Sequence, residues 1–180
     1  MLLDAAVEII CTEGVAAVTQ RAVAARAGTS LASTTYHFPK ADDLLVAAFE
    51  QTSSRTLDDI RLLGAEVTAG RTSLRDAAME LVGRAPYGTR LPADGVIQLT
   101  LSAAHNPRLR PIADAFVDRF SATLAPLVGG PAEARTLVRA LSGLILHEMA
   151  RGAAEPTETM RHDVARLFHA FGISDHDTQE

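Results

Sequence analysis

Apolar residues return at spacings of three and four in one segment of this chain after another, and this is the spacing of one face of an α-helix. In residues 2–12 the face consists of Leu3, Ala6 and Ile10, and Gly14 ends the segment. Aromatic residues make up only 4% of the 180 residues and Trp is absent, so a core must be built mainly from aliphatic side chains and Ala, which suits packed helices. We predict an all-α fold with about nine helices and no convincing sheet.

Two short helices near the N-terminus are joined by a glycine turn. Thr19 is placed to cap a helix over residues 20–27, and Gly28 suits the left-handed residue that closes it. Ser30 offers the next cap, for a helix over residues 31–37 that a proline then stops. Two short helices around such a turn form the unit that places its second helix in the major groove of DNA.

The formal net charge of -5 argues against a nucleic-acid partner, because phosphate contacts favour a basic surface. The distribution of charge is more informative than the sum. No acidic residue occurs between Gly14 and Ala41, whereas Arg21, Arg26 and Lys40 all lie in this window. The window contains both short helices, and it predicts a local surface that phosphates can approach.

The remaining segments predict the other helices. A long fourth helix begins at Asp42 and Asp43 and ends near Gly64, a fifth covers residues 74–82, and residues 86–95 read as a loop. Residues 96–104 are apolar nearly all round and fit either a helix or a buried strand. Three further helices follow, the last with a clear apolar stripe, and the tail from Ser174 is polar.

Several classes of function find no support. The chain has no nucleophile elbow and no glycine-rich phosphate loop. His147 and Glu148 are adjacent, but no second His follows at the spacing of a zinc-protease motif. No apolar stretch reaches the roughly 18 residues of a membrane span, and the lone Cys11 fits a reducing compartment. We expect a soluble cytoplasmic protein that is not an enzyme and has no metal or cofactor.

The segment "TQRAVAARAGTSLASTTYHFPKADDLL", preceded by "LLDAAVEIICTEG", resembles the DNA-binding domain of TetR-family regulators. The match covers roughly the first quarter of the chain. It implies a helix-turn-helix domain over residues 1–45 and an effector-binding and dimerisation domain over residues 46–180, whose helices eight and nine build the homodimer. It also implies a ligand-responsive transcriptional regulator, a repressor that releases operator DNA when a small molecule binds.

The resemblance further implies that Arg21 touches phosphate and that the exposed face of the third helix reads bases. That helix has no Arg, Asn or Gln for a bidentate base contact, so DNA shape can carry more of the specificity. Tyr36 either contacts phosphate or packs the third helix against the first, and His37 is equally open. The expected DNA-binding residues are Thr19, Arg21, Ser30, Leu31, Ser33, Thr34, Tyr36, His37 and Lys40.

An effector pocket is also implied by the resemblance, with helices five to eight as its wall. Simple core packing is an equally good interpretation of each apolar candidate, and a hydrophobic or aromatic effector is the default for a mostly apolar lining. The expected lining is Leu81, Val96, Leu99, Leu101, Phe116 and Phe120, with Tyr87, His105, His147 and Glu148 as polar anchors.

A second hypothesis comes from the net negative charge and from the lack of a basic arm before the first helix. Under it, the chain is a helical ligand-binding or interaction protein without sequence-specific DNA binding. An activator on the same fold is a further alternative. The acid-free window favours the DNA-binding regulator, because a module that no longer held DNA would have no reason to keep it clear of acids.

Overall fold

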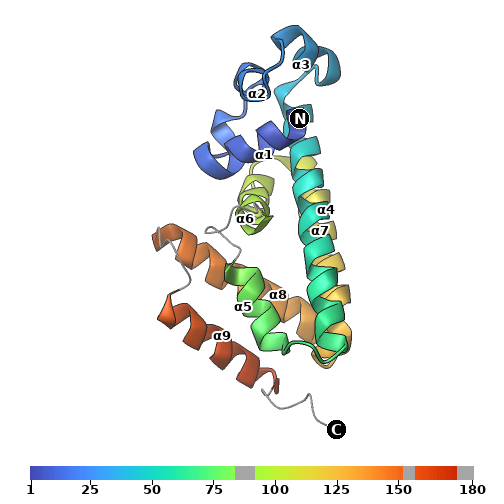
Figure 1. Cartoon of the computed structure of the whole chain (residues 1–180), viewed down its shortest axis with the longest axis vertical. Helices are drawn as coiled ribbons and strands as arrows, with labels where there is room; N and C mark the ends of the chain where they lie inside the picture. Colours follow the sequence, from blue (N-terminus) through green and yellow to red (C-terminus); the bar gives the residue numbers. More distant parts are fainter. Residues whose placement is uncertain (84–91, 152–156, 174–180) are drawn as a thin grey trace.

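The computed structural model describes residues 1–83, 92–151 and 157–173, which form nine α-helices and no strand, as predicted (Figure 1). No helix in these ranges is both long and apolar enough to cross a membrane. In chain order the elements are α1 (Leu2–Glu13), η1 (Val15–Ala17), α2 (Gln20–Arg26), α3 (Leu31–His37), α4 (Ala41–Thr68), α5 (Leu74–Gly83), α6 (Pro92–Ala103), η2 (Pro107–Leu109), α7 (Arg110–Leu124), η3 (Ala125–Leu127), α8 (Pro131–Arg151) and α9 (Glu158–Ala170), where η marks a short 3-10 helix.

The long helix α4 links the two ends of the molecule. In Figure 1, α1, α2 and α3 gather at one end, and α5, α8 and α9 lie at the other. Helix α7 packs along α4, while α6 lies between the two ends and contacts both α1 and α4. A displacement at one end can therefore reach the other through α4, α6 and α7.

The buried apolar residues form two separate cores. The head core lies among α1, α2, the start of α4 and the end of α6, and consists of Ala5, Ala6, Val7, Ile9, Ile10, Val18, Val23, Leu44, Ala48, Phe49, Leu99, Ala103 and Leu109. The body core lies among the other helices and consists of Leu57, Ile60, Ala78, Val96, Ile97, Phe116, Phe120, Leu124, Val128, Ala134, Leu137, Val138, Leu141, Ile145, Met160, Val164 and Phe168.

Helix α6 belongs to both cores, and its beginning corrects the prediction of a loop over residues 86–95. The helix begins at Pro92, and residues 86–91 lie outside the described ranges. Proline is tolerated in the first turn of a helix, because its missing N–H would have no partner there. Gly95 brings α6 close to α4: a Cβ built on it would lie 2.5 Å from Thr52 Cγ2. Gly95, which suggested a loop in the sequence, therefore lies where α6 crosses α4 at close range.

Helix α4 is also longer than predicted. It continues past Gly64 to Thr68, and Gly70, with a φ of 68°, follows its end. Gly64 packs against α7, where an added Cβ would lie 3.2 Å from Thr123 Cγ2. The close approach to α7 explains why a residue with poor helix propensity is used inside this helix.

Polar contacts hold α1 onto α4 at the surface of the head. The Asp4 carboxylate accepts hydrogen bonds from Gln51 Nε2 at 3.0 Å and from Arg55 Nη2 at 2.7 Å. It also accepts one from the Met1 ammonium at 2.6 Å. Hydrogen bonds from the ammonium and then from Arg55 lower the pKa of Asp4 well below its usual range.

Candidate nucleic-acid interface and effector cavity

The caps predicted for α2 and α3 are present and set the direction of each helix. Thr19 Oγ1 accepts a hydrogen bond from Ala22 N at 3.1 Å, and Ser30 Oγ accepts one from Ser33 N at 3.0 Å. Between them, Gly28 has a φ of 63°, the left-handed conformation expected of the turn. The backbone of the helix-turn-helix is therefore built as the residue pattern predicted.

Helix α3 presents one face to solvent. Tyr36 is 83% exposed and Leu31 is 41% exposed, and Ser30 and His37 are exposed as well. The Tyr36 ring meets His37 edge to face, with ring centroids 5.3 Å apart. The exposure of Tyr36 decides against the alternative that it packs α3 against α1.

Thr34 lies on the opposite face of α3. It is fully buried, and its Oγ1 donates a hydrogen bond to the Ser30 carbonyl at 3.2 Å. This burial corrects the prediction that placed Thr34 with the exposed residues. Thr34 follows Ser33 in the helix, so its side chain turns about 100° further round the axis and enters the interior. Ser33 itself is only half-buried.

The basic residues of the acid-free window differ in their partners. Arg26 is engaged by α1, with Nη1 2.7 Å from a Glu8 oxygen and Nη2 2.5 Å from a Glu13 oxygen. Arg21 and Lys40 are exposed and have no ion-pair partner among the described residues. Two cations are thus left available for phosphate beside α3, one at the start of α2 and one just before α4.

A charged cluster joins the start of α4 to the turn before α7. Arg108 Nη1 lies 2.6 Å from Asp42 Oδ2 and 2.8 Å from Asp43 Oδ1, and Asn106 Nδ2 donates to Asp42 at 2.5 Å. Hydrogen bonding to Asp43 and then to Asp42 raises the pKa of Arg108. In the sequence the two aspartates mark only the start of the fourth helix, because nothing there relates them to an arginine some 65 residues away.

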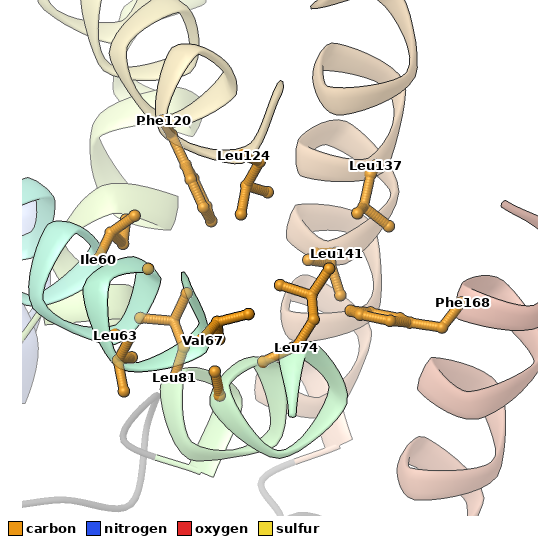
Figure 2. Close-up of a pocket in the computed structure, with 13 residues that line it drawn as sticks. Ile60, Leu63, Val67, Leu74, Leu81, Phe120, Leu124, Leu137, Leu141 and Phe168 are labelled. Carbon is orange, nitrogen blue, oxygen red and sulfur yellow. The ribbon is translucent and has the colours of Figure 1, made fainter. Parts of the chain in front are cut away.

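The body core encloses a small cavity of about 30 Å³. Figure 2 shows side chains from α4, α5, α7, α8 and α9 converging on it. Its wall is Ile60, Leu63, Gly64, Val67, Leu74, Ala77, Ala78, Leu81, Phe120, Leu124, Leu137, Leu141 and Phe168.

The predicted lining residues separate into groups. Leu81 and Phe120 line the cavity, whereas Val96 and Phe116 are buried in the same core without lining it. Leu99 is fully buried in the head core. Helix α6 therefore contributes apolar residues to both cores. This division could not be predicted, because the sequence of α6 is apolar nearly all round.

The four predicted polar anchors do not gather at the cavity. His105 and His147 are exposed, as is the apolar candidate Leu101, and Tyr87 lies outside the described residues. Glu148 is buried, but its Oε2 accepts a hydrogen bond from Thr157 Oγ1 at 2.8 Å. Glu148 thus holds the residue that caps α9.

The sequence analysis missed the contributions of α4 and α9 to the wall. Ile60, Leu63 and Val67 come from α4, and Phe168 comes from α9. The sequence predicts a fourth helix that ends near Gly64, before Val67, and the resemblance places the ninth helix in the dimer contact. Apolar periodicity identifies the buried face of a helix without naming the helices it meets.

The helix-turn-helix and the helical body define a class, the helix-turn-helix DNA-binding proteins with a separate ligand-binding body. Family models agree with this class over most of the chain: residues 2–48 match the bacterial regulatory proteins of the tetR family, and residues 69–170 match the tetracyclin repressor-like C-terminal domain. The chain belongs to the TetR family. It is a ligand-responsive DNA-binding transcriptional regulator and not an enzyme, which sets aside the alternative without DNA binding.

Solved structures support the same assignment. The multidrug binding protein EbrR, complexed with imidazole, has a TM-score of 0.72 and 31% identity over 92% of each chain. Its complex with ethidium also has a TM-score of 0.72 and 31% identity, over 92% of this chain and 95% of that chain. A TetR-family member from Streptomyces coelicolor A3 has a TM-score of 0.74 and 31% identity, over 92% and 95%. No curated protein matches the chain.

Proposed function

We propose that this regulator is a repressor that contacts its operator through the open face of α3 and the two cations beside it. Repression is typical of the family. The observation that carries the proposal is the pairing of an exposed α3 face with two cations that have no partner among the described residues. The proposed contact residues are Thr19, Arg21, Ser30, Leu31, Ser33, Tyr36, His37 and Lys40.

Within this surface, phosphate and base contacts have different sources. Arg21 and Lys40 supply positive charge and would hold phosphates in a salt-dependent way, without reading sequence. The hydroxyls of Ser30 and Ser33 and the His37 imidazole can serve base edges or phosphates. Because α3 offers no bidentate reader, much of the specificity would come from DNA shape.

Two copies of the chain would place their α3 helices in successive major grooves, about 34 Å apart. We propose that α8 and α9 form the homodimer contact. The outward side of α8 supports this, because Gly143 has no heavy atom within 4 Å of a Cβ built on it and Leu146 is exposed. A glycine on an outward helix face allows close approach of a second helix.

The proposed division of labour follows the two domains predicted from the sequence. Residues 1–45 would bind DNA, and residues 46–180 would bind the effector and dimerise. The two parts are mechanically joined, since Phe49 of α4 and Leu99 of α6 belong to the head core. A regulator of this kind works where the chromosome is, so we propose a cytoplasmic location.

We propose the cavity of the body core as the effector site. EbrR, which is 31% identical, has been solved with ethidium, so this fold accepts a small molecule in a related protein. The cavity of about 30 Å³ is far smaller than small-molecule sites, which range over roughly 300–1,000 Å³. An effector would therefore have to push helices apart.

That expansion provides a mechanism for release of DNA. Ile60 and Val67 of α4 line the cavity, and the same helix begins at the Asp42 cluster that Arg108 holds. Displacing α4 in the body would turn the head, and the spacing of two heads in a dimer would no longer fit the operator. A ligand that binds only the expanded state shifts the equilibrium by its differential affinity.

The test is fluorescence anisotropy of the full chain with DNA adjoining its own gene and with a scrambled duplex. Specific binding should weaken as salt rises, and Arg21→Ala should reduce the slope of log affinity against log salt by about one. Arg71→Ala is the matched control, because Arg71 pairs with Glu66 at the far end of α4. If the slope of log affinity against log salt is the same for the wild type and Arg21→Ala, Arg21 does not contact phosphate.

A further inference from the structure

The wall of the body cavity consists of hydrocarbon. Figure 2 shows the labelled side chains converging from five helices, and each is Ile, Leu, Val or Phe. Gly64 is the one lining residue in this wall with only backbone to offer, and its carbonyl accepts a hydrogen bond from Thr68 Oγ1 at 2.9 Å. A ligand in this space would meet no side-chain hydrogen-bond partner from the described wall.

Charged side chains on the same helices are directed elsewhere. On α4, Asp58 and Arg61 pair with each other at 2.5 Å, and more than half of each side chain is exposed. Among the described residues, Glu148 is the one buried carboxylate, and Thr157 donates to it. The described wall therefore offers no counter-ion to a charged ligand.

Two buried hydroxyls near the body core are satisfied within their own helices. Thr56 Oγ1 donates to the Thr52 carbonyl at 3.0 Å, and Ser121 Oγ donates to the Val117 carbonyl at 2.7 Å. Neither hydroxyl lines the cavity. Ser53 Oγ of α4 is buried without a hydrogen-bond partner among the described residues, but it does not line this cavity either. None of these three hydroxyls is therefore placed to recognise a ligand in the cavity.

We infer that the effector is an uncharged, hydrocarbon-rich small molecule, and that this wall selects against cations and anions. The inference rests on the effector site proposed above, and it separates this chain from EbrR, which has been solved with the cation ethidium. Burying an ion without a partner is strongly unfavourable, whereas removing apolar surface from water is favourable. Phe120 and Phe168 contribute two aromatic rings to the wall, and these add a preference for a ligand with an aromatic group.

The small size of the cavity also means that the wall must move outward when this ligand binds. Only about 30 Å³ of space is already present, and the rest must come from that movement. Truncating a wall residue would lower the cost of that movement, and filling the existing space would raise it. Leu141→Ala and Ala78→Leu are such a pair of opposite changes, because both residues line the cavity.

The experiment compares probes that share a skeleton and differ by one charged group, by fluorescence titration of the full chain without DNA. N-phenyl-1-naphthylamine is neutral, and 8-anilino-1-naphthalenesulfonate carries a sulfonate on the same skeleton. Diphenylhexatriene and its trimethylammonium derivative form the second pair, neutral against cationic. We expect each neutral probe to bind about tenfold or more tightly than its charged partner.

The two variants identify the site of binding. We expect Leu141→Ala to strengthen binding of the neutral probe several-fold and Ala78→Leu to weaken it by a similar factor, with circular dichroism confirming the fold of each. If a charged probe binds as tightly as its neutral partner and responds to the same variants, the cavity stands as the site but the inference is overturned. If no probe responds to either variant, the proposed effector site itself fails, while the operator assay remains a separate test of DNA binding.

Discussion

The head core and the body core are built from similar aliphatic side chains, but their surroundings differ. Hydrogen bonds and ion pairs connect the helices around the head core: Asp4 joins α1 to α4, and Arg26 joins α2 to α1. The Gln20 side chain also donates to the Phe38 carbonyl and so links α2 to the end of α3. Polar contacts also join body helices, through Arg135 with Asp118 and Thr157 with Glu148, but the body core itself contains a cavity with a wall of apolar residues.

This difference matches two mechanical demands. A DNA-reading surface must hold its side chains in one geometry, and directional hydrogen bonds between elements resist small displacements. A site that accepts a ligand by expansion benefits from non-directional apolar contacts, because these can slide without leaving polar groups unpaired. The comparison predicts that equal changes in the two cores have unequal consequences.

The largest effect is expected for Phe49→Ala in the head core. Phe49 is fully buried, so its truncation should lower the free energy of unfolding by about 3–5 kcal/mol and abolish operator binding. Phe168→Ala in the body core is the matched change. It should cost less, because Phe168 already borders unfilled space and loses fewer contacts. Urea denaturation followed by circular dichroism measures both, and equal losses would break the comparison.

A smaller effect is expected at the helix crossing between the cores. Gly95→Ala places a methyl group 2.5 Å from Thr52 Cγ2, and the overpacking should cost about 1–3 kcal/mol despite the better helix propensity of Ala. Gly143→Ala is the control inside another helix. An added methyl group meets no atom within 4 Å in the protomer, so at a protein concentration low enough to keep the chain monomeric the change should raise stability by up to about 1 kcal/mol.

The same control tests the proposed dimer. If α8 packs against a second copy at Gly143, the Ala variant should dissociate more readily in sedimentation experiments while its protomer unfolds at a higher temperature.

A thermal shift of the same sign and size for Gly95→Ala and Gly143→Ala would show that α6 does not depend on its close approach to α4.

Arg108→Ala tests the coupling between the body cavity and the DNA-binding head. Arg108 is 51% exposed, so Arg108→Ala should alter the free energy of unfolding only slightly. It should, however, reduce by about threefold to tenfold the factor by which a bound neutral probe lowers operator affinity. Arg135→Ala is the control, since its pair with Asp118 has similar exposure but joins two body helices. Anisotropy titrations with and without probe measure the factor; an unchanged factor would exclude the Arg108 cluster from the coupling.

The smallest effect is expected for the Asp4 contacts that join α1 to α4. Because the pKa of Asp4 is lowered in the fold, its contribution to stability is fully present above the unfolded value of about 3.9. The contribution is lost as the pH falls through the folded pKa. Asp4→Asn should therefore be slightly less stable than the wild type from pH 7 to about pH 4, and the difference should shrink below that. A constant difference in urea midpoint down to pH 2 would contradict this assignment.

Local signals in the sequence were sufficient for the DNA-binding module. Thr19 and Ser30 cap their helices as predicted, and Gly28 takes the left-handed conformation, because caps and turns depend on residues only a few positions apart. The placement of Thr34 failed, since side-chain direction in a seven-residue helix depends on where its neighbours lie.

Contacts between distant residues were beyond the reach of these signals. Leu99 was expected in an effector pocket but belongs to the head core, and Glu148 was expected as a polar anchor but holds Thr157. The Arg108 cluster was not anticipated at all. In each case the deciding partner comes from another helix, and a periodic pattern carries no information about which helix that is.

The sequence by itself determined the helical class, the two short helices with their glycine turn, and the acid-free window around them. These properties follow from propensity, capping and local charge, which act over a few residues. Only the tertiary structure decided which apolar faces form which core and that the body contains a hydrocarbon-lined cavity. It also decided that Arg26 forms ion pairs, whereas Arg21 and Lys40 have no ion-pair partner in the described part of the chain. These properties depend on the packing of helices distant in the chain, which brings together residues that share no local pattern.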